Sequence, residues 1–316
     1  MEFDLIARIR DRCAHRRSDV GLGIGDDAAL LDVPASRQLV ACTDTLVAGV
    51  HFPGGTAPED IGWKSLAVNL SDLAAMGAEP AWVLLALTLP DGDATFVERF
   101  ADGFAELARA HGVSLIGGDT TQGPLAVTVT ALGSVPRGAA LKRNGARVGD
   151  AVFVTGTLGD AAGALKMLME GRSASAALLA RLHRPEPRVT EGSALRGLAS
   201  ACIDISDGLL ADLGHVCQAS GVGAELAADA LPLSSALSAE FDAGACRQLA
   251  LAGGDDYELC FTVPRGDEER VAAALAARGC EASRIGRVVA GSGVQVLDSL
   301  GNEIATPRAG WEHFSS

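Results

Sequence analysis

The sequence predicts a mixed α+β (α/β mixed) protein of two domains. Strand-like and helix-like segments alternate along both halves of the chain. The length of 316 residues matches about two domains of ordinary size. Glycine contributes 38 residues and aromatic residues only 4%, a mix that suits glycine-rich loops between α and β elements. A chain this long can bury a large core, so folding needs neither a structural metal nor disulfides.

The first half begins with a helix-like segment and then contains strands and two further helices. The apolar and polar residues of LAVTVTALGSV alternate as they do in a half-buried strand, and Gly77 is a stop signal for the helix before it. The helices are expected at 3–15, 59–77 and about 94–111, and the strands at 38–43, which ends at Asp44, 82–89, 113–117 and 125–135.

The second half follows a polar, glycine-containing segment, KRNGARVGD at 142–150, which indicates a domain boundary. We therefore expect domains at 1–140 and 141–316. Strands are expected at AVFVTG, 201–205, ELCFTV, 284–289 and 293–297, and helices near 159–171, 174–183 and 187–199, from about Ser206, near 243–251 and at 267–278.

The charge and the cysteines exclude several classes of protein. A net charge of −14 argues against a non-specific nucleic-acid binder, which would present a basic face. No apolar run approaches the ~20 residues of a membrane helix, and no basic start with an apolar stretch follows Met1. The seven cysteines form no C-x-x-C pair, which favours reduced thiols in a cytoplasmic protein and makes a zinc site improbable.

Several common functional motifs are absent or out of context. G-x-G-x-x-A at 23–28 resembles a dinucleotide fingerprint, but LLDVP follows where a helix should begin. No Gly-Lys pair exists, which excludes a P-loop. No G-x-S-x-G elbow is present and the six histidines are dispersed, so a serine hydrolase is poorly supported. DISDGLLAD lacks the ligand spacing of an EF-hand.

Aspartates recur instead, mostly in glycine loops and after apolar runs. Each alone is explained as a turn or cap residue, but together they suit Mg²⁺, which shares its coordination shell with phosphates and water. Asp72 differs, because it lies in an apolar helix on the same face as Asn69. The other aspartates of this kind are Asp26, Asp27, Asp44, Asp119, Asp204, Asp207, Asp255 and Asp256.

Three other residues have both a functional and an ordinary interpretation. Ser206 is placed to cap a helix whose first amides would face a phosphate. Arg143 is either a cation of the site or a solvated linker charge. Trp311 is either part of an aromatic pocket for a cation or a C-terminal anchor on the core.

Six long motifs, in order, resemble the thiamine-monophosphate kinase family. They are GIGDDAALL, TDTLVAGVHF, LAVNLSDLAAMGAEPAW, LIGGDTTQGPL, DISDGLLADLGH and GGDDYELCFTV, and the likeness extends to GWEHF near the end. More distantly, the pattern is similar to the ATP-dependent superfamily of aminoimidazole ribonucleotide synthetase and selenophosphate synthetase.

This resemblance implies ATP- and Mg²⁺-dependent transfer of the γ-phosphoryl group to thiamine monophosphate, which forms thiamine diphosphate. Because no Ser–His pair is evident in the sequence, we expect direct in-line transfer assisted by several Mg²⁺ ions. The charge and the lack of a long apolar run argue against nucleic acid or a membrane as partner. The resemblance also implies a homodimer in which the N-terminal domains, which bind ATP and Mg²⁺, pair their sheets into a barrel. The C-terminal α/β domain would complete the active site.

The resemblance also assigns roles to individual residues of this chain. Asp44, Asp119 and Asp207 are expected to be catalytic. ATP contacts are expected from Gly118, Asp119, Arg143 and Ser206, and substrate contacts from His51, Asp255 and Trp311. The expected metal ligands are Asp27, Cys42, Thr43, Asp44, Asp72, Asp119, Asp204 and Asp207.

Two positions depart from the family pattern. Position 255 is often Glu and is Asp here, one methylene shorter; position 42, commonly Ser, is Cys. The cysteine is harmless if its backbone carbonyl binds the metal, and costs a ligand if a hydroxyl is needed. Three alternatives stay open: a related ATP-dependent synthetase with a different phosphorylated substrate, a Mg²⁺-dependent phosphatase, and a non-catalytic metal-binding or scaffold protein.

Overall fold

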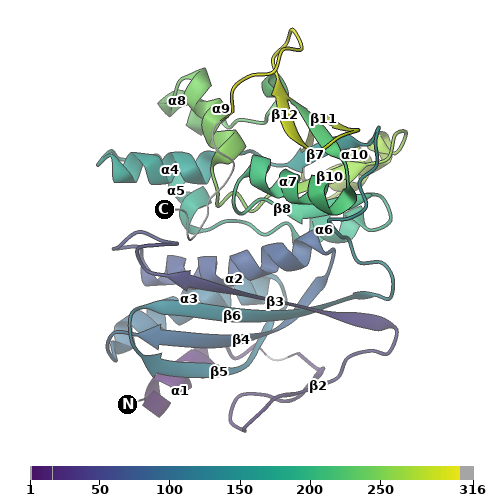
Figure 1. Ribbon diagram of the computed structural model, residues 1–316. Coiled ribbons are helices and arrows are strands. Elements are labelled where there is room, and N and C mark those ends of the chain that lie inside the picture. Colours follow the sequence, from purple (N-terminus) through teal and green to yellow (C-terminus); the bar gives the residue numbers. More distant parts are fainter. Residues whose placement is uncertain (1, 16, 307–316) are drawn as a thin grey trace. The chain divides into compact units, whose positions relative to one another are not determined.

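The structure, a computed structural model, describes residues 2–15 and 17–306 (Figure 1). The chain divides into two compact units, each with its own sheet and helices. Unit 1 comprises the chain to Leu73 together with Ala78–Gly138, and unit 2 comprises Ala74–Gly77 together with the chain from Ala139. The mixed α+β, two-domain class predicted from the sequence is therefore confirmed. No helix among the described residues is long and apolar enough to cross a membrane.

Unit 1 contains a four-stranded sheet in the order β3-β6-β4-β5. Strand β6 pairs antiparallel with β3 and with β4, whereas β4 and β5 are parallel. A separate two-stranded pair, β1 and β2, precedes the sheet. The bounds are β1 Val20–Leu22, β2 Leu30–Leu31, β3 Arg37–Val47, β4 Glu79–Leu89, β5 Ser114–Gln122 and β6 Ala126–Pro136.

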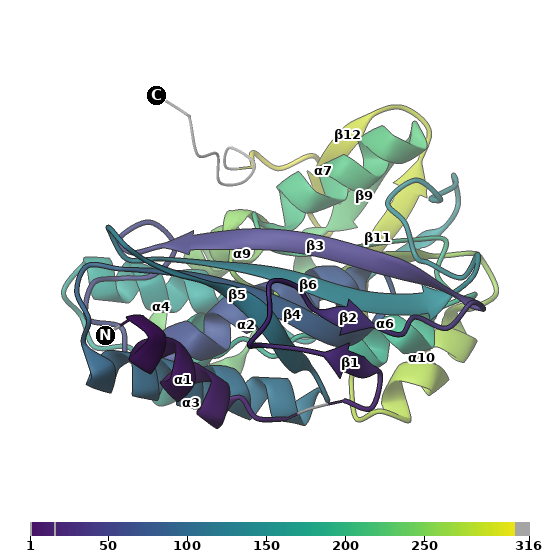
Figure 2. The same cartoon turned by 90° about the horizontal axis from the view of Figure 1, so that it is seen from below.

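Three helices of unit 1, α1 (Glu2–Arg12), α2 (Pro58–Ala75) and α3 (Ala94–Ala110), complete its core. Helix α1 lies against α3 (Figure 2). Helices α2 and α3 touch through glycines: a Cβ added at Gly62 would lie 2.1 Å from the Phe100 carbonyl oxygen. The glycines therefore permit an approach of the two backbones that a larger side chain would prevent.

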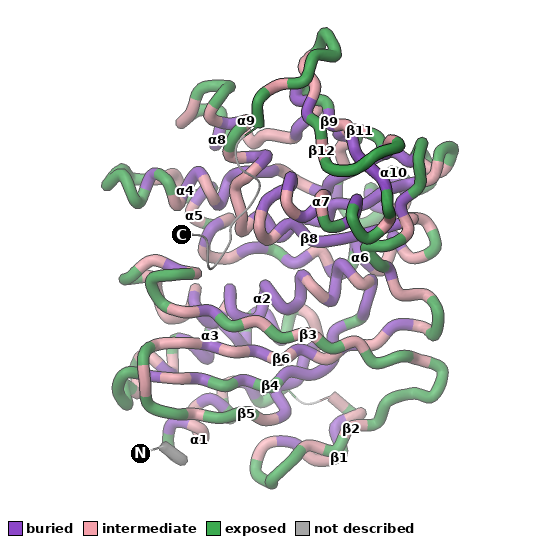
Figure 3. The backbone as a smooth tube through the Cα atoms, in the orientation of Figure 1, coloured by how far each residue is buried: buried purple, intermediate pink, exposed green. Residues whose placement is uncertain are grey.

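Unit 2 contains a six-stranded sheet in the order β12-β9-β11-β7-β10-β8. The β12–β9 pair is parallel and the other pairs are antiparallel. Strands β7, β8 and β10 are buried along their whole length (Figure 3). The bounds are β7 Ala151–Thr155, β8 Ala201–Asp204, β9 Gly223–Ala227, β10 Leu259–Val263, β11 Ala282–Val289 and β12 Gly293–Leu297.

The helices of unit 2 connect these strands and bury apolar side chains against the sheet and against one another. The 3₁₀ turn η1 (Ala228–Ala230) follows β9. The helices are α4 Asp160–Met169, α5 Ala176–His183, α6 Val189–Leu195, α7 Leu209–Ser220, α8 Ser235–Glu240, α9 Ala243–Ala252 and α10 Glu268–Ala276.

The expected elements are present, but three details differ from the prediction. Strand β3 continues to Val47 and β5 to Gln122, so Asp44 and Asp119 lie within strands and not after their ends. The polar residues at the ends of β3 and β5 can belong to a strand because strand pairing uses backbone hydrogen bonds, which do not depend on the type of side chain. The short elements β1, β2, β9, η1 and α8 were not predicted, since few residues carry each pattern.

Candidate functional site

In unit 1, strand β3 and helix α2 bring two carboxyl groups together. Alternation along β3 turns Cys42 and Asp44 toward α2. There Asp44 forms a side-chain hydrogen bond with Asp72. Burial raises the pKa of Asp44, and this outweighs the opposite effects of the Asp72 hydrogen bond and the His51 charge. The expected proximity of Asp44 and Asp72, 28 residues apart in sequence, is therefore present within one unit.

A half-buried carboxyl pair of this kind fits a divalent cation. Two carboxylates repel each other unless a proton or a cation neutralises one of them. Carboxylate oxygens are ligands that Mg²⁺ prefers, and this ion keeps part of its shell for water and phosphate. Among the residues that the structure describes, no group of three or more His, Cys, Asp or Glu side chains is arranged to hold a metal.

Cys42 and Thr43 have side chains already engaged elsewhere. The Cys42 thiol donates to the Asn69 carbonyl at 3.4 Å, and burial, followed by the Asp72 and Asp44 charges, raises the pKa of this thiol. A protonated thiol is a poor metal ligand, which favours the backbone carbonyl as the ligating group. The Thr43 hydroxyl lies on the opposite face of the sheet, where it donates to the Val129 carbonyl at 3.0 Å.

His51 follows β3 in a turn that fixes its ring. Its Nδ1 accepts the Val47 backbone N–H at 3.0 Å. An acceptor at Nδ1 means that the proton of the neutral ring is on Nε2. The sequence reasoning missed Lys64 on α2, which is buried and donates to the His51 carbonyl at 3.2 Å. A single lysine within the apolar run of this helix was the signal that could have revealed it.

Asp27 and Asp119 are exposed carboxylates on backbone shaped by glycine. The Asp27 N–H donates to the Asp26 carboxylate at 2.9 Å. Asp119 follows Gly118, whose φ is +149° and where an added Cβ would lie 1.8 Å from the Leu85 carbonyl oxygen. The glycine before Asp119 is therefore required by the close pairing of β5 with β4, next to a bulge in that pair.

In unit 2, Asp204 ends β8 and Asp207 lies in the loop before α7. The prediction that Ser206 caps this helix is wrong. Helix α7 begins at Leu209 with Gly208 as its N-cap, without a side-chain cap bond. The reason is Asp212, whose carboxylate accepts the backbone N–H groups of residues 206, 207 and 208 at 3.0, 3.1 and 3.2 Å.

Asp212 is a second residue that sequence reasoning missed. It is buried, and burial, followed by the charges of Asp204 and Asp207, raises its pKa to about 8. Its bonds to three successive amides hold the loop that carries Asp207. Those amides are therefore engaged by a carboxylate of the chain itself. The motif DISDGLLAD contained the signal, since it ends on Asp212, which lies in the first turn of α7.

Asp255 lies in the loop between α9 and β10, in a strained conformation. Its φ is +68°, and that of Tyr257 is +50°. Holding a residue other than glycine in this left-handed region costs about 1 kcal/mol or more. The Asp255 N–H donates to the Ser206 carbonyl at 2.9 Å, and the Tyr257 hydroxyl donates to the Asp255 carboxylate at 2.9 Å. The loop of Asp255 is thus joined to the loop of Ser206.

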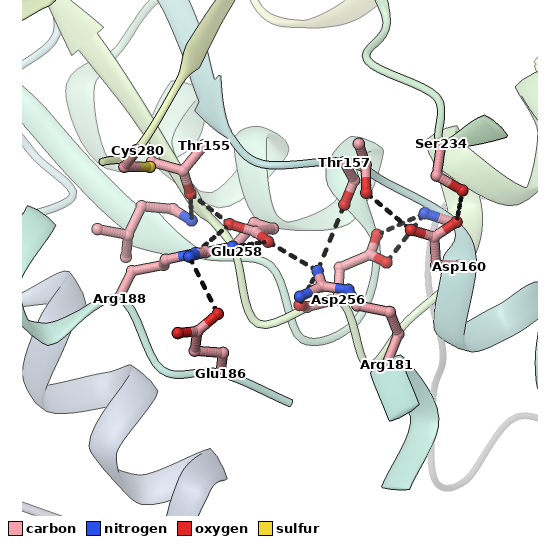
Figure 4. Close-up of polar contacts among 12 residues, drawn as sticks. Thr155, Thr157, Asp160, Arg181, Glu186, Arg188, Ser234, Asp256, Glu258 and Cys280 are labelled. Atoms are coloured by element: carbon pink, nitrogen blue, oxygen red, sulfur yellow. Dashed lines mark hydrogen bonds and ion pairs between the residues drawn. The ribbon is translucent and has the colours of Figure 1, made fainter. Parts of the chain in front are cut away.

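A buried ionic network lies directly after this loop (Figure 4). The Glu258 carboxylate is fully buried. It accepts from Arg181 at 2.7 Å, from two nitrogens of Arg188 at 2.7 Å each, and from the Thr155 hydroxyl at 2.6 Å. Burial by itself would raise the pKa of Glu258, but the Arg188 and Arg181 interactions prevail and lower it. The carboxylate is therefore held in its charged form.

Acid should remove part of the stability that Glu258 provides. Because the pKa of Glu258 is lower in the folded than in the unfolded chain, its contribution is complete above the unfolded value and is lost as pH falls through the folded value. We expect Glu258→Gln to lower the free energy of unfolding at pH 6, and to lower it less at pH 3. Urea unfolding at both pH values measures this difference; an equal loss at both would contradict it.

Arg143 and Trp311 are the last two residues to which the resemblance assigned a role. Arg143 is exposed in the segment after Leu141, and its carbonyl accepts from the Ser220 hydroxyl at 3.0 Å. Trp311 lies outside the described residues.

Comparison with known proteins follows the same division of the chain. Residues 25–135 match the family model "AIR synthase related protein, N-terminal domain" and residues 147–299 match "AIR synthase related protein, C-terminal domain". A thiamine-monophosphate kinase of Salmonella typhimurium is 47% identical over 322 residues, covering 100% of this chain and 98% of the relative. The chain belongs to the thiamine-monophosphate kinase family.

Solved structures of this family have the same fold. The crystal structure of thiamine-monophosphate kinase from Stenotrophomonas maltophilia is 52% identical, with a TM-score of 0.88 over 93% of this chain and 96% of that one. A second, AaThiL complexed with AMPPCP and TMP, is 35% identical, with a TM-score of 0.79 over 99% of this chain and 97% of that one. The resemblance inferred from the six motifs is therefore confirmed over the full length.

Proposed function

We propose that this chain transfers the γ-phosphoryl group of ATP to thiamine monophosphate in one direct, in-line step assisted by several Mg²⁺ ions. The class of reaction, ATP-dependent phosphorylation of thiamine monophosphate to thiamine diphosphate, is supported by family membership over the whole chain. The relative AaThiL, whose structure is complexed with AMPPCP, an ATP analogue, and TMP, supports both ligand classes. The single structural observation that supports the metal-assisted step is the half-buried Asp44–Asp72 pair.

The charges of the two substrates explain why the chain needs carboxylates. ATP carries about four negative charges and a phosphate monoester about two near neutral pH, so their approach is strongly repulsive in a shielded site. Bound Mg²⁺ supplies positive charge that neutralises and aligns phosphate oxygens. The ligands that we assign to it are Asp27, Cys42 through its carbonyl, Thr43, Asp44, Asp72, Asp119, Asp204 and Asp207.

Other residues of the chain would bind and orient the two substrates. We assign ATP contacts to Gly118, Asp119, Arg143 and Ser206. For the substrate, His51 offers Nε2–H as a donor, because its Nδ1 accepts the Val47 N–H. Asp255 offers a carboxylate, which suits a thiazolium cation, and Trp311 an aromatic face for the same charge.

Incubation with ATP, Mg²⁺ and thiamine monophosphate tests the reaction. Thiamine diphosphate and ADP should appear in equal amounts, identified by mass. Free phosphate formed without an acceptor would instead indicate a phosphatase. Turnover with a different phosphorylated substrate, but none with thiamine monophosphate, would indicate a related synthetase.

Direct transfer predicts inversion of configuration at phosphorus. The sequence indicates no Ser–His pair, and the carboxylate oxygens of the candidate aspartates are assigned to metal. ATP made chiral by isotopic and sulfur substitution at the γ-phosphorus measures the outcome. Net retention would require a phosphoenzyme, and Asp27, Asp44, Asp119 or Asp207 would then become the nucleophile.

A homodimer is the expected assembly, formed by pairing the sheets of two copies of unit 1 into a barrel. One face of this sheet carries threonines that hydrogen-bond in pairs, Thr43 with Thr130 and Thr45 with Thr128. Leu39 and Leu84 are also exposed on these strands, and an exposed sheet invites association. Light scattering should give twice the chain mass of 32.2 kDa. A mass of one chain at all working dilutions would contradict the dimer.

A further inference from the structure

We propose that Glu258 is a positioning residue for substrate recognition, because its buried ionic network fixes the strained loop that presents the Asp255 carboxylate. This inference rests on the proposed role of Asp255 toward the cationic ring of the substrate. Glu258 itself is fully buried and therefore acts through the loop and not through contact with substrate.

The loop needs external support because of its own conformation. Asp255 and Tyr257 both have positive φ and flank Asp256, which does not. Two left-handed residues other than glycine, so close together, persist only where the surrounding structure determines them. Such strain commonly marks a residue whose side chain must point in one particular direction.

Backbone bonds attach the loop to the end of β8. The Asp255 and Tyr257 N–H groups donate to the Ser206 and Ile205 carbonyls at 2.9 and 2.8 Å. The Ile205 N–H donates in return to the Glu258 carbonyl at 2.8 Å. These bonds set the backbone on both sides of Asp256, and the Tyr257 hydroxyl then fixes the plane of the Asp255 carboxylate.

Arg181 links this loop to the Glu258 carboxylate. One guanidinium nitrogen of Arg181 donates both to Glu258 and to the Asp256 carbonyl, at 2.7 and 3.2 Å (Figure 4). On the other side of the loop, the Asp256 carboxylate accepts the Gly159 N–H at 2.9 Å. The loop is therefore fixed both to α5, which carries Arg181, and to the residue before α4.

The Glu258 carboxylate occupies space that is open only because residue 156 is glycine. A Cβ added at Gly156 would lie 2.3 Å from an oxygen of Glu258, so a larger residue at 156 would displace the carboxylate. A buried ion pair is in general weak evidence for stability, since apolar residues of similar volume often serve as well. Two arginines on one carboxylate beside a strained loop are better explained by preorganisation of a recognition group.

Glu258→Gln tests the inference, because it retains the shape and removes the charge. The first readout needs no substrate: amide hydrogen exchange of residues 255 and 257 in the full chain should become about tenfold faster. The second is kinetic: KM for thiamine monophosphate should rise about tenfold, while KM for ATP stays within about twofold. Tyr257→Phe should raise KM for thiamine monophosphate without changing exchange.

Asp150→Asn is the matched control. Asp150 is another buried carboxylate of unit 2, and its bonds go to the Arg147 N–H and the Ser200 hydroxyl at 3.0 and 2.6 Å. This variant should lose stability but keep both the exchange rates at 255 and 257 and the KM for thiamine monophosphate. If Glu258→Gln does not fold, Arg188→Lys, which retains a charge but loses the paired bonds, is measured in the same way.

Several outcomes would overturn the inference. One is a folded Glu258→Gln protein with unchanged exchange; another is an equal rise of both KM values, which indicates general damage. Faster exchange with an unchanged KM for thiamine monophosphate would show that the loop does not serve recognition. A parent protein that does not phosphorylate thiamine monophosphate would refute the proposed function instead, and the exchange measurement separates the two cases because it uses no substrate.

Discussion

Replacing Asp44 or Asp72 with asparagine should reduce phosphoryl transfer by about a thousandfold or more, which corresponds to about 4 kcal/mol of transition-state stabilisation. The two carboxyl groups form a side-chain hydrogen bond within unit 1, and either change removes one of the charges that would hold Mg²⁺ there. The fold should survive. Burial raises the pKa of Asp44, so at neutral pH its charge is unfavourable without metal, and the neutral asparagine should unfold no more easily than the parent.

Two measurements together distinguish loss of metal binding from loss of structure. Turnover is measured over a range of Mg²⁺ concentrations, and thermal unfolding is measured with a chelator and with Mg²⁺–ATP. The parent should gain stability from Mg²⁺–ATP, and the two variants should gain less. Asp102→Asn is the control, because Asp102 belongs to the same unit and pairs with Arg12 at the surface. Near-normal turnover in both variants at ordinary Mg²⁺ would refute the shared metal site.

Replacing Gly118 with alanine should destabilise unit 1 by about 3 kcal/mol or more. At φ +149° a Cβ would lie 1.8 Å from the Leu85 carbonyl oxygen on the adjacent strand. That oxygen belongs to the paired backbone of β4, so it cannot move without disturbing the β4–β5 pairing. Asp119, the next residue, would be displaced, and we expect activity to fall together with stability.

Gly112→Ala provides the matched control for this substitution. Gly112 precedes the same strand and also has a positive φ, of +62°, but an added Cβ would meet nothing within 4 Å. Gly112→Ala should therefore lower the free energy of unfolding only by the cost of conformational strain, about 1 kcal/mol. Urea unfolding gives the free energy of unfolding of each variant. The difference between Gly118→Ala and Gly112→Ala is the contribution of the steric clash. Equal losses would mean that the backbone at Gly118 relaxes freely.

The sequence indicated most elements and the family because these depend on local patterns. Apolar periodicity placed α2, α3 and β6 near their observed positions. The six motifs identified the family over the full length, which the relatives confirm. Local pattern also predicted that Asp72 and Asn69 share a face of one helix. In the structure both side chains contact residues of β3, Asn69 through the Cys42 thiol and Asp72 through Asp44.

Local sequence pattern could not predict structural details that depend on a residue far away in the chain. Ser206 had the features of a helix cap, but the Asp212 carboxylate takes the amides that the cap would have used. The polar residues after Gly118 carry no strand pattern, so the sequence did not predict that β5 extends through Asp119. That extension depends on pairing with β4. The Thr43 hydroxyl, next to Asp44 in the chain, lies on the other face of the sheet.

The sequence by itself determined the class of fold, the family and the set of candidate carboxylates, because propensity, periodicity and long motifs are properties of contiguous residues. Only the tertiary structure showed that Asp44 lies beside Asp72 in unit 1. It alone also revealed two carboxylates outside the candidate set: Asp212, which accepts loop amides, and Glu258, which is paired with two arginines. The physical reason is that a buried charge takes its ionisation state and its direction from groups brought near by folding, and such groups can be far away in the chain.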